Sequence, residues 1–146
     1  MIAITGAGEY LDIIRPYDEI LLNKLKDDPY VLCFPTAAGL ESKDRIQYWL
    51  DLGDDHFTKL NVNHKSIRAL NVDDYNKPET LAEIEKANFI YFSGGNPNHL
   101  YDTLSSSLAW EKLLNIHNNG GILAGCSAGA MIMGEKMNKG KGFGFF

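Results

Sequence analysis

The chain has few cysteines, no long apolar run and no cluster of basic residues, and each shortage excludes a class of protein. Only two of the 146 residues are cysteine, and both Cys33 and Cys126 lie in or beside apolar runs. Buried reduced thiols are therefore expected rather than a disulfide framework. No apolar run approaches the roughly 20 residues that span a bilayer, and the first residues lack the pattern of a signal peptide. The 14 Lys and Arg are scattered in a chain of net charge −5. We therefore expect a cytoplasmic protein that contacts neither nucleic acid nor a membrane.

Length and composition predict one globular domain over residues 1–146. The chain is 45% apolar and 23% charged, a composition that can form a hydrophobic core without disulfides or a structural metal. No histidines or carboxylates stand at metal-ligand spacing, so neither a metal nor another cofactor is expected. Gly6-Ala7-Gly8 follows the first apolar run but lacks the third glycine of a dinucleotide-binding loop, which favours a plain turn. The sequence predicts no oligomeric state.

Apolar runs of strand length alternate with helical patterns along the chain. Strands are expected at residues 1–5, 30–34, 66–72, 88–92 and 122–126, and helices at 17–26, 42–60, 79–87, 98–103 and 109–118. A loop is expected at 73–77, and Gly53 is a weak point of the second helix. This alternation is typical of an α/β fold with a doubly wound, mostly parallel sheet and helices on both faces. Ligands bind at the carboxyl ends of such strands, so loops 6–9, 93–96 and 126–129 should share one edge.

The stretch from Gly125 to Gly129 has the Gly-x-Ser-x-Gly pattern of a nucleophile elbow. An elbow presents its central residue, here Ser127, at the start of a helix, where a developing negative charge is stabilised. The N–H of Ala128 is then the first expected oxyanion donor. Cys126 stands one position too early for a nucleophile and should face the interior.

A glycine pair after the expected strand at 88–92 is the second motif of interest. Backbone at Gly94 and Gly95 can approach a substrate closely and offer a second oxyanion donor, although an ordinary strand-to-helix turn explains the pair equally well. Glu9 and Asn96 are candidates for contacts with polar groups of a substrate. Asn96 is equally suited to cap the helix that follows.

The two motifs together resemble the peptidase E (aspartyl dipeptidase) family of serine peptidases, which includes the cyanophycinases. The resemblance is carried by the run from Tyr91 to Asn96 with Leu100, and by the run from Gly125 to Ala130, in the same order. It implies a fold like the class I glutamine amidotransferase domain and Ser127 as the nucleophile. It also implies oxyanion donors at Gly95 and Ala128, and small peptides, including those with an N-terminal Asp, as substrates. Beside these donors, Gly94 and Asn96 are expected to contact the substrate.

The chain departs from this family in having no histidine after Ser127, where the family places its catalytic base. We therefore expect that the C-terminal part of the family's domain is missing and that the chain alone has little activity. His99, beside the glycine pair, is the one upstream histidine near the expected site, as a base or, preferably, as a substrate contact. The other three histidines, His56, His64 and His117, are expected at the surface.

Two other functions remain open. The first is a domain that keeps the elbow but only binds a ligand or a partner, because it lacks the base. The second is an esterase or amidase that uses the same serine on acyl groups other than peptides.

Overall fold

Five parallel strands form the central sheet of the computed structural model, which describes residues 1–137 and 139–146. Their order across the sheet is β1-β5-β4-β2-β3. The strands are β1 (Ile2–Thr5), β2 (Tyr30–Phe34), β3 (Asn63–Ser66), β4 (Phe89–Phe92) and β5 (Ile122–Cys126). A separate antiparallel pair consists of β6 (Lys136–Met137) and β7 (Gly140–Lys141). The parallel α/β architecture confirms the predicted fold class.

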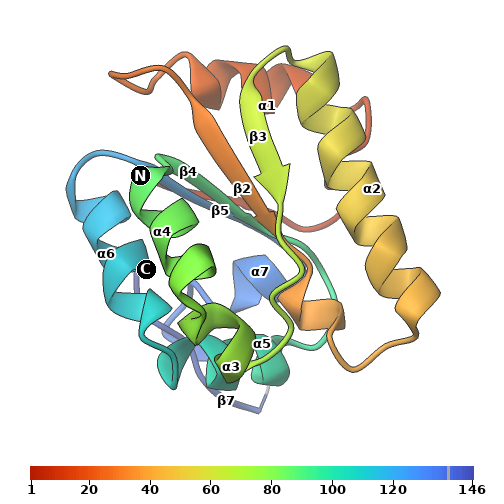
Figure 1. Ribbon diagram of the computed structural model, residues 1–146, viewed down its shortest axis with the longest axis vertical. Helices are drawn as coiled ribbons and strands as arrows, with labels where there is room; N and C mark the ends of the chain where they lie inside the picture. Colours follow the sequence, from red (N-terminus) through yellow and green to blue (C-terminus); the bar gives the residue numbers. More distant parts are fainter. Residues whose placement is uncertain (138) are drawn as a thin grey trace.

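Helices cover the sheet in two groups (Figure 1), with α1 and α2 on one side of the molecule and α3 to α6 gathered on the other. The first group is α1 (Arg15–Leu22) and α2 (Lys43–Lys59). The second group is α3 (Val72–Asn76), α4 (Pro78–Lys86), α5 (Pro97–Ser105) and α6 (Ala109–Asn118). Two short elements, the 3₁₀ turn η1 (Thr36–Ala38) and α7 (Ala128–Met131), follow the carboxyl ends of β2 and β5.

Alternation along the central strands divides the core into two clusters. Successive side chains of a strand point to opposite faces of the sheet. Ile90 and Phe92 of β4 accordingly pack with α4, α5 and α6, whereas Phe89 and Tyr91 pack with Leu22 of α1 and Phe57 of α2 on the other face. A strand buried on both faces reads as one continuous apolar run, which is why β2 and β4 could be predicted from the sequence.

The predicted strand at 66–72 and the predicted loop at 73–77 are wrong. The strand β3 lies earlier, at Asn63–Ser66, where it pairs with β2 at the edge of the sheet. Its residues are polar because an edge strand with partly exposed faces needs no apolar run. The residues predicted as loop form α3 instead, whose first turn is capped by the Asn71 side chain accepting the N–H of Asp74 at 3.0 Å.

Helix α2 runs without a break through Gly53. A Cβ at this position would lie 3.1 Å from Ser66 Oγ and 3.3 Å from Cys33 Cβ. The small residue thus lets the helix approach the sheet closely, and the packing outweighs the weak helical propensity of glycine.

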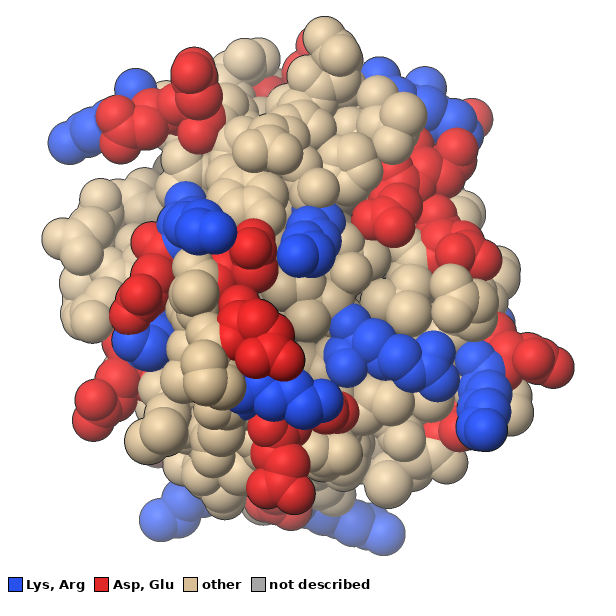
Figure 2. All heavy atoms as spheres, viewed as in Figure 1, with Lys and Arg blue, Asp and Glu red and all other residues tan. Residues whose placement is uncertain are grey.

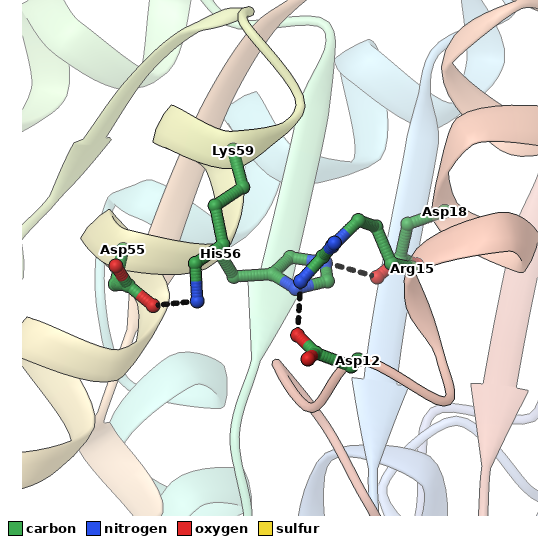
Figure 3. A network of polar contacts seen from close by, with 6 residues as sticks. All are labelled: Asp12, Arg15, Asp18, Asp55, His56 and Lys59. Carbon is green, nitrogen blue, oxygen red and sulfur yellow. Dashed lines mark hydrogen bonds and ion pairs between the residues drawn. The ribbon is translucent and has the colours of Figure 1, made fainter.

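His56 is buried, not at the surface as predicted. It is 1% exposed, and its Nε2 lies 2.8 Å from Oδ2 of Asp18 on α1, as Figure 3 shows. The ring packs against Tyr10 and Phe57. The other two ion pairs in the figure, Arg15 with Asp12 and Lys59 with Asp55, are more exposed. The buried pair joins α1 to α2 across this face of the sheet.

Replacing His56 with leucine is expected to lower the free energy of unfolding by about 2 kcal/mol, because the Asp18 carboxyl stays buried without its hydrogen-bond partner. Urea denaturation followed by circular dichroism measures the change. The control is Lys59→Ala on the same helix, whose exposed ion pair should matter by no more than about 0.5 kcal/mol. An unchanged unfolding midpoint in His56→Leu would contradict this role for the pair.

Charges of both signs share the surface of the molecule. On the face drawn in Figure 2, Lys and Arg side chains stand beside Asp and Glu, and no large patch of one sign forms there. No helix in the described part of the chain is long and apolar enough to cross a membrane.

Candidate active site

The three loops predicted to share one edge of the sheet do so. Their strands β1, β5 and β4 are neighbours, and all three end at the same edge. The N–H of Ser127 donates to the carbonyl of Thr5 at 3.1 Å, which ties the loop after β5 to the end of β1. A Cβ at Gly94 would lie 3.4 Å from Ser127 Cβ and 3.7 Å from Ser127 Oγ. The serine and the glycine pair are therefore adjacent.

Ser127 occupies the strained turn that the elbow pattern predicts. Its φ of 49° and ψ of −110° are unusual for a residue other than glycine, and its side chain is exposed. The turn closes tightly because of its glycines: a Cβ at Gly125 would lie 2.3 Å from the Gly129 carbonyl, and one at Gly129 2.3 Å from the Phe92 carbonyl oxygen. The backbone therefore projects the Ser127 hydroxyl outward, as nucleophile elbows do.

The backbone N–H groups of Ala128 and Gly95, both near Ser127, have no acceptor among the described residues. Ala128 is the first residue of α7, where an N–H has no partner within the helix. Gly95 is exposed, and its φ of 142° is open to glycine but not to other residues. Its neighbours are bonded elsewhere: the Gly94 N–H donates to Glu9 Oε1 at 2.9 Å and the Asn96 N–H to the Ala37 carbonyl at 2.7 Å. The Gly95 and Ala128 N–H groups are thus two donors still available beside Ser127.

Cys126 faces the interior, as predicted. The side chain is fully buried, and its Sγ donates to Glu9 Oε2 at 2.8 Å. Burial, reinforced by the Glu9 carboxyl, raises the pKa of Cys126 to about 11. A thiol with such a pKa stays protonated near neutral pH and is a poor nucleophile.

Glu9 is buried, unlike a side chain that is open to a substrate. It is 7% exposed, and both carboxyl oxygens are occupied by Gly94 and Cys126. The prediction that Glu9 lies in the loop after the first strand, beside the other two loops, is confirmed. Its inward direction could not be read from the pattern, because that depends on how the loops after β4 and β5 fold against it.

None of the four histidines forms a hydrogen bond to Ser127 in the described structure. The Nε2 atom of His99 lies 2.8 Å from the Leu70 carbonyl oxygen, and the main-chain N–H of His99 donates to Oδ1 of Asn96 at 3.1 Å. Asn96 therefore caps α5, which is one of its two predicted roles. His64 is bonded to the Val62 carbonyl, and His117 lies 3.3 Å from the N-terminal amine. With His56 bound to Asp18, all four rings have partners away from the serine.

An apolar groove of about 680 Å³ lies beside the open edge of β1, between this strand and α1. Its lining includes Ile4, Ile13, Tyr17 and Gly125, together with the buried carboxyl of Asp18, but not Ser127. The groove is thus next to the elbow and separate from the exposed hydroxyl. Within the described residues, no three His, Cys, Asp or Glu side chains gather as metal ligands do.

The chain is thus an α/β protein in which a strained serine stands between a parallel strand and a helix, beside a glycine loop from the next strand. The model of Peptidase family S51 matches residues 1–143, and the chain therefore belongs to this family. This finding confirms the resemblance inferred from the motifs.

Solved structures agree with the family. A peptidase from an acI-B1 Actinobacterium superimposes with a TM-score of 0.92 at 34% identity, covering 98% of this chain and 63% of its own. A candidate peptidase E from Listeria monocytogenes EGD-e superimposes with a TM-score of 0.63 at 20% identity, covering 90% of this chain and 60% of its own, and supports the fold alone. The chain therefore spans less than two thirds of the length of either protein. No match was found among curated proteins.

Proposed function

We propose that this protein is a serine-type peptidase that hydrolyses small peptides, with Ser127 as its nucleophile. The observation that carries the proposal is the exposed Ser127 hydroxyl on its strained turn, directly beside Gly94. Membership of a peptidase family and the 34% identity to the actinobacterial peptidase support the reaction class. Such a turn holds the hydroxyl away from the main chain, where a substrate carbonyl can reach it.

In the proposed reaction, the Ser127 Oγ attacks the carbonyl carbon of a peptide bond while a base accepts its proton. The N–H groups of Gly95 and Ala128 donate to the oxyanion that forms. The amine product leaves with a proton from that base, and an acyl-enzyme remains on Ser127. Water then hydrolyses the ester and frees the serine. Gly94, Asn96 and His99 would line the substrate side of this edge.

The proposed substrates are short peptides, including those with an N-terminal Asp, and the proposed location is the cytoplasm. The substrates follow from the resemblance to the peptidase E family, and the location follows from the two buried, unpaired cysteines. The chain has three arginines, Arg15, Arg45 and Arg68. Within the described residues, no contact places any of them at Ser127.

A domain that binds a ligand without catalysis is the second candidate. It is favoured by one observation: each of the four histidines is bonded away from Ser127. On this reading the elbow and the glycine loop would form a binding site for a peptide carbonyl.

Hydrolysis of aspartyl p-nitroanilide distinguishes these candidates, with imidazole added as a base from solution. We expect release of p-nitroaniline by the wild-type chain and its loss in Ser127→Ala, because no acyl-enzyme can form. The matched control is Ser105→Ala, an exposed serine whose Oγ bonds to the Asp102 carbonyl in its own helix. Equal rates in the wild type and Ser127→Ala would exclude Ser127 as the nucleophile.

A further inference from the structure

The carboxyl group of Glu9 connects all three loops of the candidate site. Glu9 itself belongs to the loop after β1. One oxygen accepts the N–H of Gly94 in the loop after β4 at 2.9 Å, and the other accepts the thiol of Cys126 at the end of β5 at 2.8 Å. The group is buried, and no ion pair in the described residues involves it. A single side chain thus meets each loop that approaches Ser127.

Unusual backbone on both sides of Glu9 turns its side chain inward. Gly8 has φ of 89° and Tyr10 φ of 63°, and the N–H of Leu11 closes the turn on the Gly8 carbonyl at 3.1 Å. A bulky residue such as tyrosine rarely adopts a positive φ. Tyr10 is held in it by packing, with its ring 4.8 Å from that of Tyr91 and 6.2 Å from that of Phe57. Strained residues of this kind cluster where function requires a fixed geometry.

The chemistry of the Glu9 contacts is not that of a stabilising ion pair. Burying a carboxyl group beside neutral donors alone costs free energy that an apolar side chain of similar size would not. What the carboxyl does provide is an acceptor for one particular main-chain group, the N–H of Gly94. A buried N–H needs such a partner, and its bond fixes the direction in which the peptide faces.

The Gly94–Gly95 peptide is held from both ends. Gly94 stands between the carboxyl and the serine, since a Cβ on it would lie 3.0 Å from Glu9 Oε1 and 3.7 Å from Ser127 Oγ. Gly95 packs against η1, where a Cβ would lie 2.4 Å from the Ala37 carbonyl, and the Asn96 N–H bonds to that same carbonyl. With both ends anchored, the direction of the Gly95 N–H is set by Glu9 on one side and η1 on the other.

We infer that Glu9 is a positioning residue: its carboxyl anchors Gly94 and thereby orients the Gly95 N–H toward the oxyanion formed at Ser127. The inference rests on the proposed function for its catalytic consequence, but not for the contact itself. Glu9 does not touch the substrate, and it acts through the glycine loop. Cys126 is its second anchor, and its protonated thiol donates to the same carboxyl.

Amide hydrogen exchange measured by NMR tests the contact in the 146-residue protein. In Glu9→Ala, protection of the Gly94 amide is expected to fall about 10- to 100-fold, because a hydrogen bond to a carboxylate is lost. Glu9→Gln keeps the size of the side chain and a carbonyl acceptor. Protection of the Gly94 amide in this variant should therefore lie between that of the wild type and that of Glu9→Ala. Cys126→Ala keeps the Glu9–Gly94 bond and should retain protection. Glu111→Ala, an exposed glutamate on α6, is the matched control.

Kinetics in the imidazole-supplemented assay test the consequence. The kcat of Ser127-dependent hydrolysis is expected to fall about 10- to 100-fold in Glu9→Ala with little change in KM, because an oxyanion donor acts mainly in the transition state. Glu9→Gln should recover part of the loss. If Glu9 only stabilised the fold, replacing it would lower the melting temperature without lowering kcat at a nearly constant KM.

Two results would overturn the inference. One is unchanged Gly94 protection in both Glu9→Ala and Glu9→Gln. The other is lost protection with unchanged kcat, which would reduce Glu9 to a structural contact. If the wild type shows no Ser127-dependent hydrolysis, the proposed function fails instead, and the exchange data alone decide whether Glu9 anchors the loop.

Discussion

Gly129→Ala is expected to destabilise the protein by about 4 kcal/mol or more and to leave little folded chain at 37 °C. The added Cβ would lie 2.3 Å from the Phe92 carbonyl oxygen and 2.9 Å from Phe92 Cβ. Both atoms belong to the central strand β4, so neither can move without displacing the sheet. Overpacking against a flexible side chain costs less, because the side chain can change its rotamer. Thermal unfolding followed by circular dichroism measures the effect.

Gly6→Ala is the control for this substitution. Gly6 also lies in a loop at the carboxyl edge of the sheet, but a Cβ there meets no atom within 4 Å and its φ is outside the left-handed region. Its stability should change by no more than about 0.5 kcal/mol. A Gly129→Ala protein as stable as Gly6→Ala would mean that the elbow helix α7 does not pack on β4 as described.

The strands of the sheet differ in how well they could be predicted from the sequence. The runs at β2, β4 and β5 are apolar without interruption because the strands are buried on both faces, and such runs can be recognised from the sequence. Strand β3 could not be recognised in the same way. Its residues Asn63 and Lys65 are polar, and its position depends on pairing with β2 rather than on its own pattern.

The site shows the same division between local and distant causes. Ser127 and its glycines form a local turn, so five consecutive residues were enough to predict it. The positions of His56 and Glu9 depend on residues far along the chain, because His56 meets Asp18 and Glu9 meets Gly94 only in the folded protein. Partners separated by 38 and 85 residues leave no periodic signal in the sequence.

The 146-residue chain is expected to hydrolyse aspartyl p-nitroanilide with a kcat lower by about 10³-fold or more than a serine peptidase whose histidine base is in place. The reason is geometric. A serine hydroxyl needs a base within hydrogen-bond reach. His99, the one upstream histidine expected near the site, has its Nε2 atom 2.8 Å from the Leu70 carbonyl oxygen instead. Its ring is further confined by Gly39, since a Cβ there would lie 2.8 Å from that same nitrogen.

Adding imidazole should raise the Ser127-dependent rate in proportion to its concentration, since a base from solution can then reach the exposed hydroxyl. The increase should be larger at pH 8 than at pH 6, because only neutral imidazole accepts the serine proton and an imidazole group titrates near pH 6.5. His99→Ala should leave the rate dependent on the imidazole concentration, because the His99 ring meets the Leu70 carbonyl oxygen and not the Ser127 hydroxyl. A fast imidazole-independent rate that falls about tenfold or more in His99→Ala would instead identify His99 as the base. The first outcome would mean that Ser127 has no base among the described residues. The second would mean that His99 activates it.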